Sequence, residues 1–285
     1  MIKLIKYFFE CCFIYLFFLI AKIIGINFSR KLFSQIFIYV GPLIKSKKII
    51  DKNLKIFSKN ITDKHKAKII TSMWSNYAMT FIEYIFLKKF RNSSSHIRIE
   101  GEEVLNDILN KNKQVIFISG HFANFELMSM ELTKRKINLA TIYRPLNNIF
   151  INPLMEYLRK KYVCGFQIKK GRSGVREAMN YIQKKFSIAL MVDQRVSEGE
   201  KVKFFNVDSF TSTLPAQLAL KYNLDIVPIF LERKNDKFFF MKVLKPINPK
   251  KIGNKIEVTK KINQIIEDMI TKNPYQWIWT HDRWK

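Results

Sequence analysis

The hydrophobic pattern sets the first 26 residues apart from the rest of the chain. Residues 7–26 are almost entirely apolar and are interrupted only by Glu10 and Lys22. A membrane-spanning helix needs about 20 mostly apolar residues, so this stretch is long enough if both charges lie near the interfaces. A signal peptide and a buried core helix are the alternatives, although few small residues follow Ile20 to form a cleavage site. We expect a membrane-anchor helix within residues 1–26.

Residues 27–95 have a helical pattern. Apolar side chains recur every three or four positions between Ile69 and Ile85, as on the buried stripe of a helix. A polar run at 92–95 ends this part. We therefore expect residues 27–95 to form a helical N-terminal part of the body.

From Ile97 onward, short apolar runs alternate with amphipathic segments. The predicted strands are 114–119, 139–143, 188–193, 226–231 and 238–243, and the predicted helices are 125–134, 149–161, 174–185, 214–222 and 258–271. This alternation is typical of an α/β sheet covered by helices on both faces. The sequence thus predicts an α/β domain over residues 96–285, with its chemistry beyond the strand ends.

Composition adds a strong positive charge. The chain has 50 Lys and Arg against 23 Asp and Glu, a formal net charge of +27. A polyanionic partner would explain this excess; so would an AT-rich genome, which favours Lys over Arg. Basic residues flank the apolar N-terminal stretch on both sides, which favours a body held in the cytoplasm against anionic headgroups.

The cysteines indicate a reducing compartment. Cys11 and Cys12 are adjacent in the apolar stretch and Cys164 stands alone. This spacing provides neither a disulfide framework nor a zinc site. We expect no metal site, and no motif in the chain indicates nucleic-acid binding.

The segment 119–126, Ser-Gly-His-Phe-Ala-Asn-Phe-Glu, directly follows a predicted strand and is the main candidate for catalysis. His121 and Glu126 are five positions apart, which would place them about 140° apart on a continuous helix. If His121 instead lies in the loop before the helix, Glu126 in the first turn can reach back and orient the imidazole as a base. A His–Glu pair without any chemical role is the alternative.

Two further segments are candidates for substrate binding. Arg144 and Asn147 follow a predicted strand, and a guanidinium can bind a phosphate through two N–H groups. Arg172 lies in a basic, glycine-containing loop before a predicted helix, an arrangement that favours anions. An ordinary surface arginine and a solvated charged loop are the respective alternatives.

Two more polar segments lie farther along the chain. Asp193 and Gln194 end an apolar strand, where a carboxylate can be catalytic, structural or a helix cap. The C-terminal segment 276–285 contains three tryptophans and Arg283. It can anchor the chain at headgroup level or close the core; we favour closure, with Arg283 as a contact for an anion.

Taken in order, these segments resemble the bacterial lipid A biosynthesis acyltransferase family, the lauroyl and myristoyl transferases of the inner membrane. The resemblance covers nearly the whole chain. His-x4-Glu is modestly specific by itself, but its combination with Arg-Pro-x-x-Asn, Asp-Gln, Phe-Phe and Gln-Trp-x-Trp-x-His is highly specific. The family usually has Phe-Phe-Gly and Gly-Pro-Ala, whereas this chain has Phe204-Phe205-Asn206 and Leu214-Pro215-Ala216. The difference bears on the identity of the acceptor, because we expect this loop to border the substrate groove.

The resemblance implies a glycerolipid-acyltransferase-like mixed sheet flanked by helices. It implies transfer of a fatty acyl chain from acyl carrier protein, or coenzyme A, to a hydroxyl of a lipid A precursor, an anionic glycolipid. His121 would be the general base and Glu126 its orienting carboxylate, while Arg144, Asp193 and Gln194 match family motifs. No cofactor is implied, and the enzyme would lie at the bacterial inner membrane with its catalytic domain facing the cytoplasm.

Two alternatives remain open. The acceptor can be another glycolipid or a phospholipid. From a different class, the protein can be a basic, membrane-tethered binding protein without catalysis, whose affinity for polyanions would depend strongly on salt.

Overall fold

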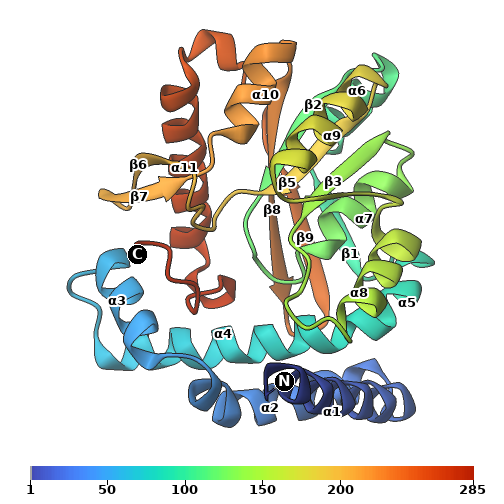
Figure 1. The fold of residues 1–285 in the computed structure, drawn as a ribbon, viewed down its shortest axis with the longest axis vertical. Helices are drawn as coiled ribbons and strands as arrows, with labels where there is room; N and C mark the ends of the chain where they lie inside the picture. Colours follow the sequence, from blue (N-terminus) through green and yellow to red (C-terminus); the bar gives the residue numbers. More distant parts are fainter. Residues whose placement is uncertain (1) are drawn as a thin grey trace.

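A computed structural model describes residues 2–285 and places a seven-stranded sheet at the centre of the molecule (Figure 1). Its strands lie in the order β1-β9-β8-β2-β5-β3-β4. In chain order they are β1 (Ile97–Glu100), β2 (Val115–Ser119), β3 (Leu139–Tyr143), β4 (Phe166–Lys169), β5 (Ser187–Met191), β8 (Asp225–Lys234) and β9 (Phe238–Val243). All neighbours are parallel except β8 and β9, which are antiparallel. The predicted mixed α/β sheet is confirmed.

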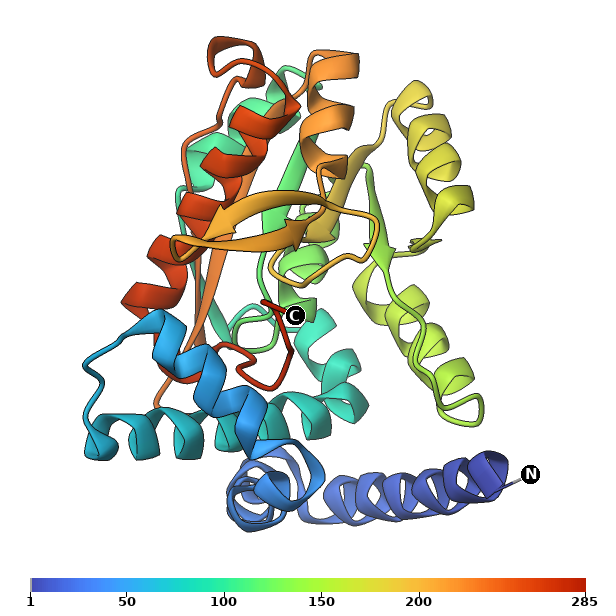
Figure 2. The same cartoon turned by 60° about the vertical axis from the view of Figure 1, so that its left-hand side comes forward.

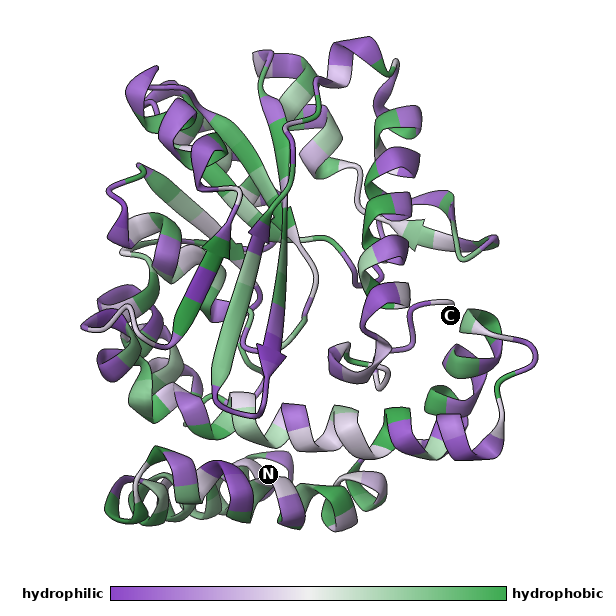
Figure 3. Ribbon diagram, turned by 180° about the vertical axis from the view of Figure 1, so that it is seen from behind, coloured by the Kyte–Doolittle hydropathy of each residue, from purple (hydrophilic) through white to green (hydrophobic). Residues whose placement is uncertain are grey.

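Helices cover both faces of the sheet. The helices α6 (Glu102–Asn110), α7 (Glu126–Lys134) and α8 (Asn152–Leu158) cover one face, and α9 (Arg172–Gln183), α10 (Leu214–Tyr222) and α11 (Lys255–Lys272) cover the other. A short π-helix, η2 (Arg159–Val163), continues α8. In β2, Val115 and Phe117 enter the first core, while Ile116 and Ile118 enter the second. This strand is apolar throughout because both of its faces are buried; hydrophobic residues predominate along most of the central strands in Figure 3.

The N-terminal third is helical. It contains α1 (Ile2–Ile24), α2 (Ile26–Ile44), α3 (Lys47–Phe57), α4 (Asp63–Glu83), η1 (Tyr84–Phe86) and α5 (Leu87–Arg91). Helix α4 crosses below the sheet, and α1 and α2 form a further layer beyond α4 (Figures 1 and 2). Gly25 separates α1 from α2 with a φ of 77°, a value that glycine adopts without strain.

The predicted N-terminal apolar helix is confirmed as α1. It is long and apolar enough to cross a membrane, and only 17% of its most apolar window is buried within the protein. The alternative of a buried core helix is therefore wrong. Large apolar side chains remain exposed along α1 and α2, including Phe9, Phe13, Leu19, Phe28 and Leu43.

A separate hairpin and the C-terminal segment complete the fold. The hairpin consists of β6 (Glu200–Phe204) and β7 (Val207–Thr211) and packs against α11. The short 3-10 helices η3 (Pro249–Lys251) and η4 (Pro274–Gln276) flank α11 in the chain. Beyond η4, Trp277 and Trp279 are buried. The C-terminal segment closes the core, as the sequence indicated.

Candidate active site

A cavity of about 890 Å³ lies beyond the carboxyl ends of β2, β5 and β3, with α4 and α1 as its opposite wall. Parallel α/β sheets bind their ligands at this edge. Helix α4 contributes Tyr77, Thr80 and Tyr84 to the wall, and α1 contributes Tyr7, Glu10 and Ile14. The lining includes five Lys or Arg side chains and two carboxylates, so the cavity favours anions.

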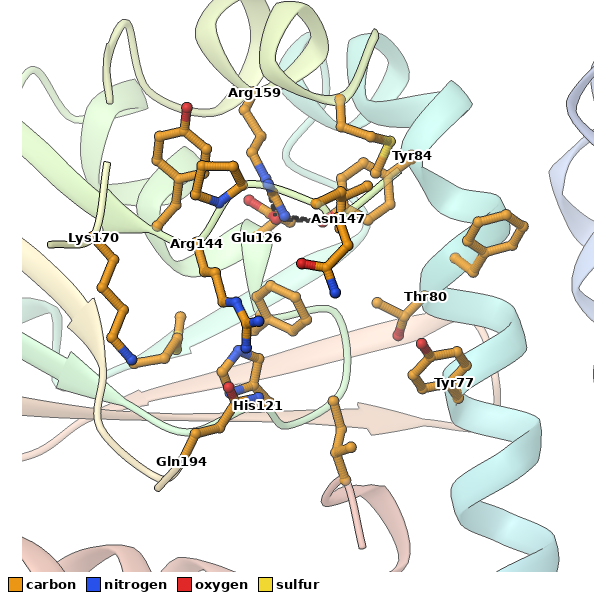
Figure 4. Close-up of a pocket in the computed structure, with 18 of the residues that line it drawn as sticks. Tyr77, Thr80, Tyr84, His121, Glu126, Arg144, Asn147, Arg159, Lys170 and Gln194 are labelled. Atoms are coloured by element: carbon orange, nitrogen blue, oxygen red, sulfur yellow. Dashed lines mark hydrogen bonds and ion pairs between the residues drawn. The ribbon is translucent and has the colours of Figure 1, made fainter. Parts of the chain in front are cut away.

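His121 lies in this cavity, in the turn formed by residues 120–125 between β2 and α7 (Figure 4). Gly120 allows the tight approach that the turn requires. A Cβ atom there would come within 2.6 Å of the Phe122 ring and 3.3 Å of the Asp193 carboxyl carbon. We call residues 120–125 the catalytic turn. The structure thus places His121 in the loop before the helix, the position that an imidazole oriented by Glu126 would have needed.

Asp193 orients His121. The Oδ1 atom of Asp193 lies 2.7 Å from Nδ1 of the imidazole, and its Oδ2 accepts a hydrogen bond of 2.8 Å from the His121 backbone N–H. The indole N–H of Trp277 donates to the same Oδ2 at 2.8 Å. Asp193 is only 2% exposed. These contacts hold ring, backbone and carboxylate in one arrangement.

The environment keeps Asp193 ionised. Burial raises the pKa of this carboxyl, but the charge of His121 and the hydrogen bonds from His121 and Trp277 outweigh burial and bring the pKa to about 2. An ionised carboxylate accepts hydrogen bonds only. The imidazole proton therefore lies on Nδ1, and the lone pair on Nε2 is available for acid–base chemistry.

Glu126 does not orient His121, and that part of the sequence interpretation is wrong. Its Oε1 accepts from Nε of Arg159 at 2.7 Å and from the Tyr84 hydroxyl. Asp193 takes its place because Ser119 of β2 pairs with Met191 of β5. His121 and Asp193 each follow these paired residues by two positions, so the register brings them side by side.

Arg159 is a residue of the cavity that sequence reasoning missed. It is 8% exposed, lines the cavity, and also donates from Nη2 to the Tyr84 hydroxyl at 2.8 Å. Its Nη1 atom is buried without a hydrogen-bond partner within residues 2–285. Burial lowers the pKa of this guanidinium, but Glu126 and Tyr84 outweigh burial and raise it. In the sequence, Arg159 is followed by two lysines and is typical of a solvated basic run.

The strand register brings Arg144 and Lys170 together. Tyr143 pairs with Lys169, so the next residue on each strand lies at the same strand end. Neither Arg144 nor Lys170 forms an ion pair with a carboxylate in the described chain. Burial and the charge of Arg144 both lower the pKa of Lys170. Two unpaired cations at one cavity wall form an anion site (Figure 4).

The other predicted binding residues separate into two groups. Asn147 and Gln194 line the cavity with Arg144. Arg172 is exposed at the start of α9 and is absent from the cavity wall that residues 2–285 form. Arg283 is fully buried, so its predicted role as an anion contact is wrong. It donates to Thr211 Oγ1 at 2.7 Å and to the Phe210 carbonyl at 3.0 Å, fixing the β6–β7 hairpin.

The two departures from the glycine pattern have different consequences. Asn206 has a φ of 60°, a left-handed conformation that asparagine tolerates, so it replaces glycine in the hairpin turn without changing the cavity. We expected the loop that carries both departures to border the groove, and this holds for its later part, with Ser212 and Leu214, but not for the turn at Asn206. Leu214, in contrast, lines the cavity and adds bulk to its wall.

No group of three or more His, Cys, Asp or Glu side chains within residues 2–285 is arranged to hold a metal ion. The polar groups gathered at the cavity are an oriented imidazole, a buried guanidinium and an anion site. Together they can move a proton and stabilise negative charge.

Comparison with known proteins identifies the family. Residues 2–285 match the family described as bacterial lipid A biosynthesis acyltransferase. Lipid A biosynthesis acyltransferase 2 of Shigella flexneri is 20% identical over 279 residues, which cover 92% of this chain and 87% of the relative. Lipid A biosynthesis lauroyltransferase of Escherichia coli (strain K12) is 21% identical over 245 residues, covering 84% and 78%.

Among solved structures, the chain is similar to the 1-acyl-sn-glycerophosphate acyltransferase PlsC from Thermotoga maritima. The TM-score is 0.43 at 17% identity, and the match covers 89% of this chain and 100% of that chain. Because the family match spans the whole described chain, the protein belongs to the bacterial lipid A biosynthesis acyltransferase family and is an acyltransferase.

Proposed function

We propose that this protein transfers a fatty acyl chain from a carrier thioester to a hydroxyl of a lipid A precursor, with His121 as the general base. The observation that carries the proposal is the 2.7 Å contact between His121 Nδ1 and an ionised, buried Asp193 at the cavity. This contact leaves Nε2 as the proton acceptor. The names of the two relatives and of the family support the lipid A acceptor.

In this mechanism, Nε2 of His121 takes the proton of the acceptor hydroxyl while its oxygen attacks the thioester carbonyl. The tetrahedral intermediate collapses as the C–S bond breaks, and the imidazolium returns the proton to the leaving thiolate. Asp193 stabilises the imidazolium between these two steps. A base in such a position contributes about 10²–10⁴ to the rate.

The negative charge of the intermediate needs a hydrogen-bond donor. Arg144 and His121 line the same cavity, and in the view of Figure 4 the Arg144 guanidinium extends toward the imidazole, so we assign Arg144 as the donor to the oxyanion. Lys170, next to Arg144, then attracts the phosphate of an anionic substrate. Arg159 lines the same cavity, and its Nη1 atom, which has no hydrogen-bond partner within residues 2–285, is free to donate to another polar group of a bound substrate.

The acyl donor is a thioester of acyl carrier protein or coenzyme A. Both are acidic molecules, and a formal charge of +27 favours their approach at low salt. No cofactor enters this mechanism, because acyl transfer from a thioester requires only a base and an oxyanion site.

The exposed apolar side chains of α1 and α2 suit an apolar environment, and we place this layer in the bacterial inner membrane. Tyr7, Glu10 and Ile14 of α1 also line the cavity, so acyl chains can pass between membrane and site. Basic residues on both sides of the apolar stretch, Lys3 and Lys6 before it and Lys45, Lys47 and Lys48 after it, favour a catalytic domain on the cytoplasmic side.

The test uses the purified full chain in detergent micelles with an acyl-carrier thioester and a lipid A precursor. Mass spectrometry is expected to show one added acyl chain per product. His121→Ala should remove this product while leaving the melting temperature within a few degrees. Unchanged product formation by this variant refutes His121 as the base. A product formed only with a glycerophospholipid acceptor refutes the acceptor but keeps acyl transfer.

A further inference from the structure

The carboxylate of Glu83 joins three parts of the molecule that are far apart in the sequence. Glu83 ends α4 and is fully buried. Its Oε1 accepts from Nε of Arg30 in α2 at 2.6 Å, and its Oε2 accepts from Nη2 of Arg233 in β8 at 3.0 Å. Its Oε2 also accepts from Nδ2 of Asn124 in the catalytic turn at 2.8 Å. Burial raises the pKa of Glu83, but Arg233 and Arg30 outweigh burial and lower it, so the carboxylate is charged.

The catalytic turn depends on α4 for its shape. Ala123 has a φ of 45°, a left-handed conformation that costs an alanine free energy and persists only when its surroundings hold it. Two hydrogen bonds from helix α4 stabilise this conformation. Thr80 Oγ1 donates to the Ala123 carbonyl at 2.8 Å, and Glu83 accepts from Asn124, which is fully buried. His121 lies two residues before Ala123.

Arg30 connects this arrangement to the outer helical layer. It is 4% exposed, and its guanidinium lies over the rings of Phe90 and Phe239. Other residues of the same helix, including Tyr39 and Leu43, leave large apolar side chains exposed. Helix α2 therefore has one part in contact with Glu83 and another open to an apolar environment.

We propose that Glu83 is a positioning residue, which couples the position of α2 against α4 to the geometry of the catalytic turn and hence to His121. The proposal rests on the role of His121 as the base. Loss of the Asn124 bond frees the turn directly. Loss of the Arg30 bond lets Glu83 move toward Arg233, and the Asn124 bond weakens as a consequence.

The experiment compares Asn124→Ala, Arg30→Met and the double variant. Arg30→Met retains apolar contact with the two phenylalanines. For Asn124→Ala we expect kcat to fall by about 10- to 100-fold with KM within about twofold, because the turn is displaced while the cavity remains. Arg30→Met should lower kcat severalfold. The double variant should be no more than about twofold slower than Asn124→Ala, since both act through one carboxylate.

The control is Arg91→Met. Arg91 donates to Thr133 Oγ1 at 2.6 Å and to the Met130 carbonyl at 3.3 Å, and thus ties α5 to α7 without touching Glu83. This variant should melt at a lower temperature with an unchanged kcat. If Asn124→Ala fails to fold, Thr80→Val is the second variant. It removes the hydrogen bond from Thr80 Oγ1 to the Ala123 carbonyl at nearly constant side-chain volume, and it should lower kcat in the same way.

A second readout does not depend on the acceptor. The chain has four histidines, so NMR of histidine-labelled protein resolves few imidazole signals. Asn124→Ala and Arg30→Met should shift the His121 signal and leave that of the exposed His65 in place. A kcat within twofold of wild type for Asn124→Ala, multiplicative losses in the double variant, or an unmoved His121 signal each overturn the inference. Absence of acyl transfer by the wild-type protein counts against the proposed function instead, while the NMR signal still tests the coupling.

Discussion

Asp193→Asn is the sharpest test of the catalytic arrangement. An asparagine keeps one oxygen to accept from the Trp277 indole and the His121 backbone, but presents an N–H₂ group to Nδ1 of the imidazole. The imidazole must then carry its proton on Nε2, and the base is lost. A tautomer reversed in this way costs about 10⁴ in kcat where a buried aspartate orients a catalytic histidine. We expect a loss of about 10³–10⁴ here, with KM little changed.

The same substitution has a defined effect on stability. The pKa of Asp193 falls from its ordinary 3.8 to about 2 in the folded protein. A depressed carboxyl pKa stabilises the fold above pH 4, and this stabilisation is lost as pH falls toward 2. The shift corresponds to about 2 kcal/mol at neutral pH. The wild-type protein should therefore lose this contribution between pH 4 and pH 2, and Asp193→Asn should lack that part of the acid transition.

The assay measures initial rates of acyl transfer from a carrier thioester, with product quantified by mass spectrometry. Asp208→Asn is the matched control. Asp208 is exposed on β7 and, within residues 2–285, forms one ion pair, with Lys203 at 3.5 Å, so its substitution should leave both kcat and stability unchanged. If Asp193→Asn retains more than about a tenth of the wild-type kcat while folded, the carboxylate does not set the tautomer and the mechanism is refuted.

Three further outcomes are expected. Replacing Arg144 and Lys170 together by methionine should raise KM for a phosphorylated acceptor by at least about tenfold and change KM for a dephosphorylated one less, while the loss of Arg144 as oxyanion donor lowers kcat for both. Equal changes in the two KM values would exclude the anion site. Leu214→Gly should shift selectivity toward longer acyl donors, because each methylene newly buried contributes about 0.8 kcal/mol, about fourfold in kcat/KM. Competition between donors of increasing length measures this selectivity, and an unchanged preference would contradict a role for Leu214 in the cavity wall. Trp277→Phe removes a hydrogen bond to a charged group and should lower the free energy of unfolding by about 2 kcal/mol in urea titrations, whereas a loss below about 0.5 kcal/mol would show that the indole N–H contributes little.

Periodicity predicted the fold where side chains alternate strongly between core and solvent. The apolar runs that became β2, β5 and β8, and the helices between them, were located to within a few residues, because burial on both faces requires continuous apolar strands. The β6–β7 hairpin was missed. Its first strand, Glu200–Phe204, has charged residues at three of five positions, since one face of the hairpin is exposed. Strand β4 was missed because it has four residues and two of them are exposed.

The sequence predicted where the site lies but not which side chains contact each other in it. We expected His121 before the helix because a base five positions ahead of Glu126 could contact it only from the preceding turn; the position is correct, although His121 contacts Asp193 instead. That Asp193 reaches His121 depends on the pairing of two strands 72 residues apart. Strand register depends on packing across the whole sheet, which the local sequence does not encode. Arg159 was missed for the same reason, because its burial depends on Tyr84 from another helix.

The two acidic residues illustrate why a neighbouring strand supplies the orienting group. Asp193 is fixed by the hydrogen-bond ladder between β2 and β5, and it binds both the ring and the backbone of His121. A glutamate in the first turn of α7 would have to reach back across the catalytic turn, whose shape itself depends on contacts with α4. Glu126 instead pairs with Arg159, and this pair holds the guanidinium at the cavity. Each carboxylate thus serves one cavity group, so substitution of Glu126 should disturb the placement of Arg159 and leave the tautomer of His121 intact.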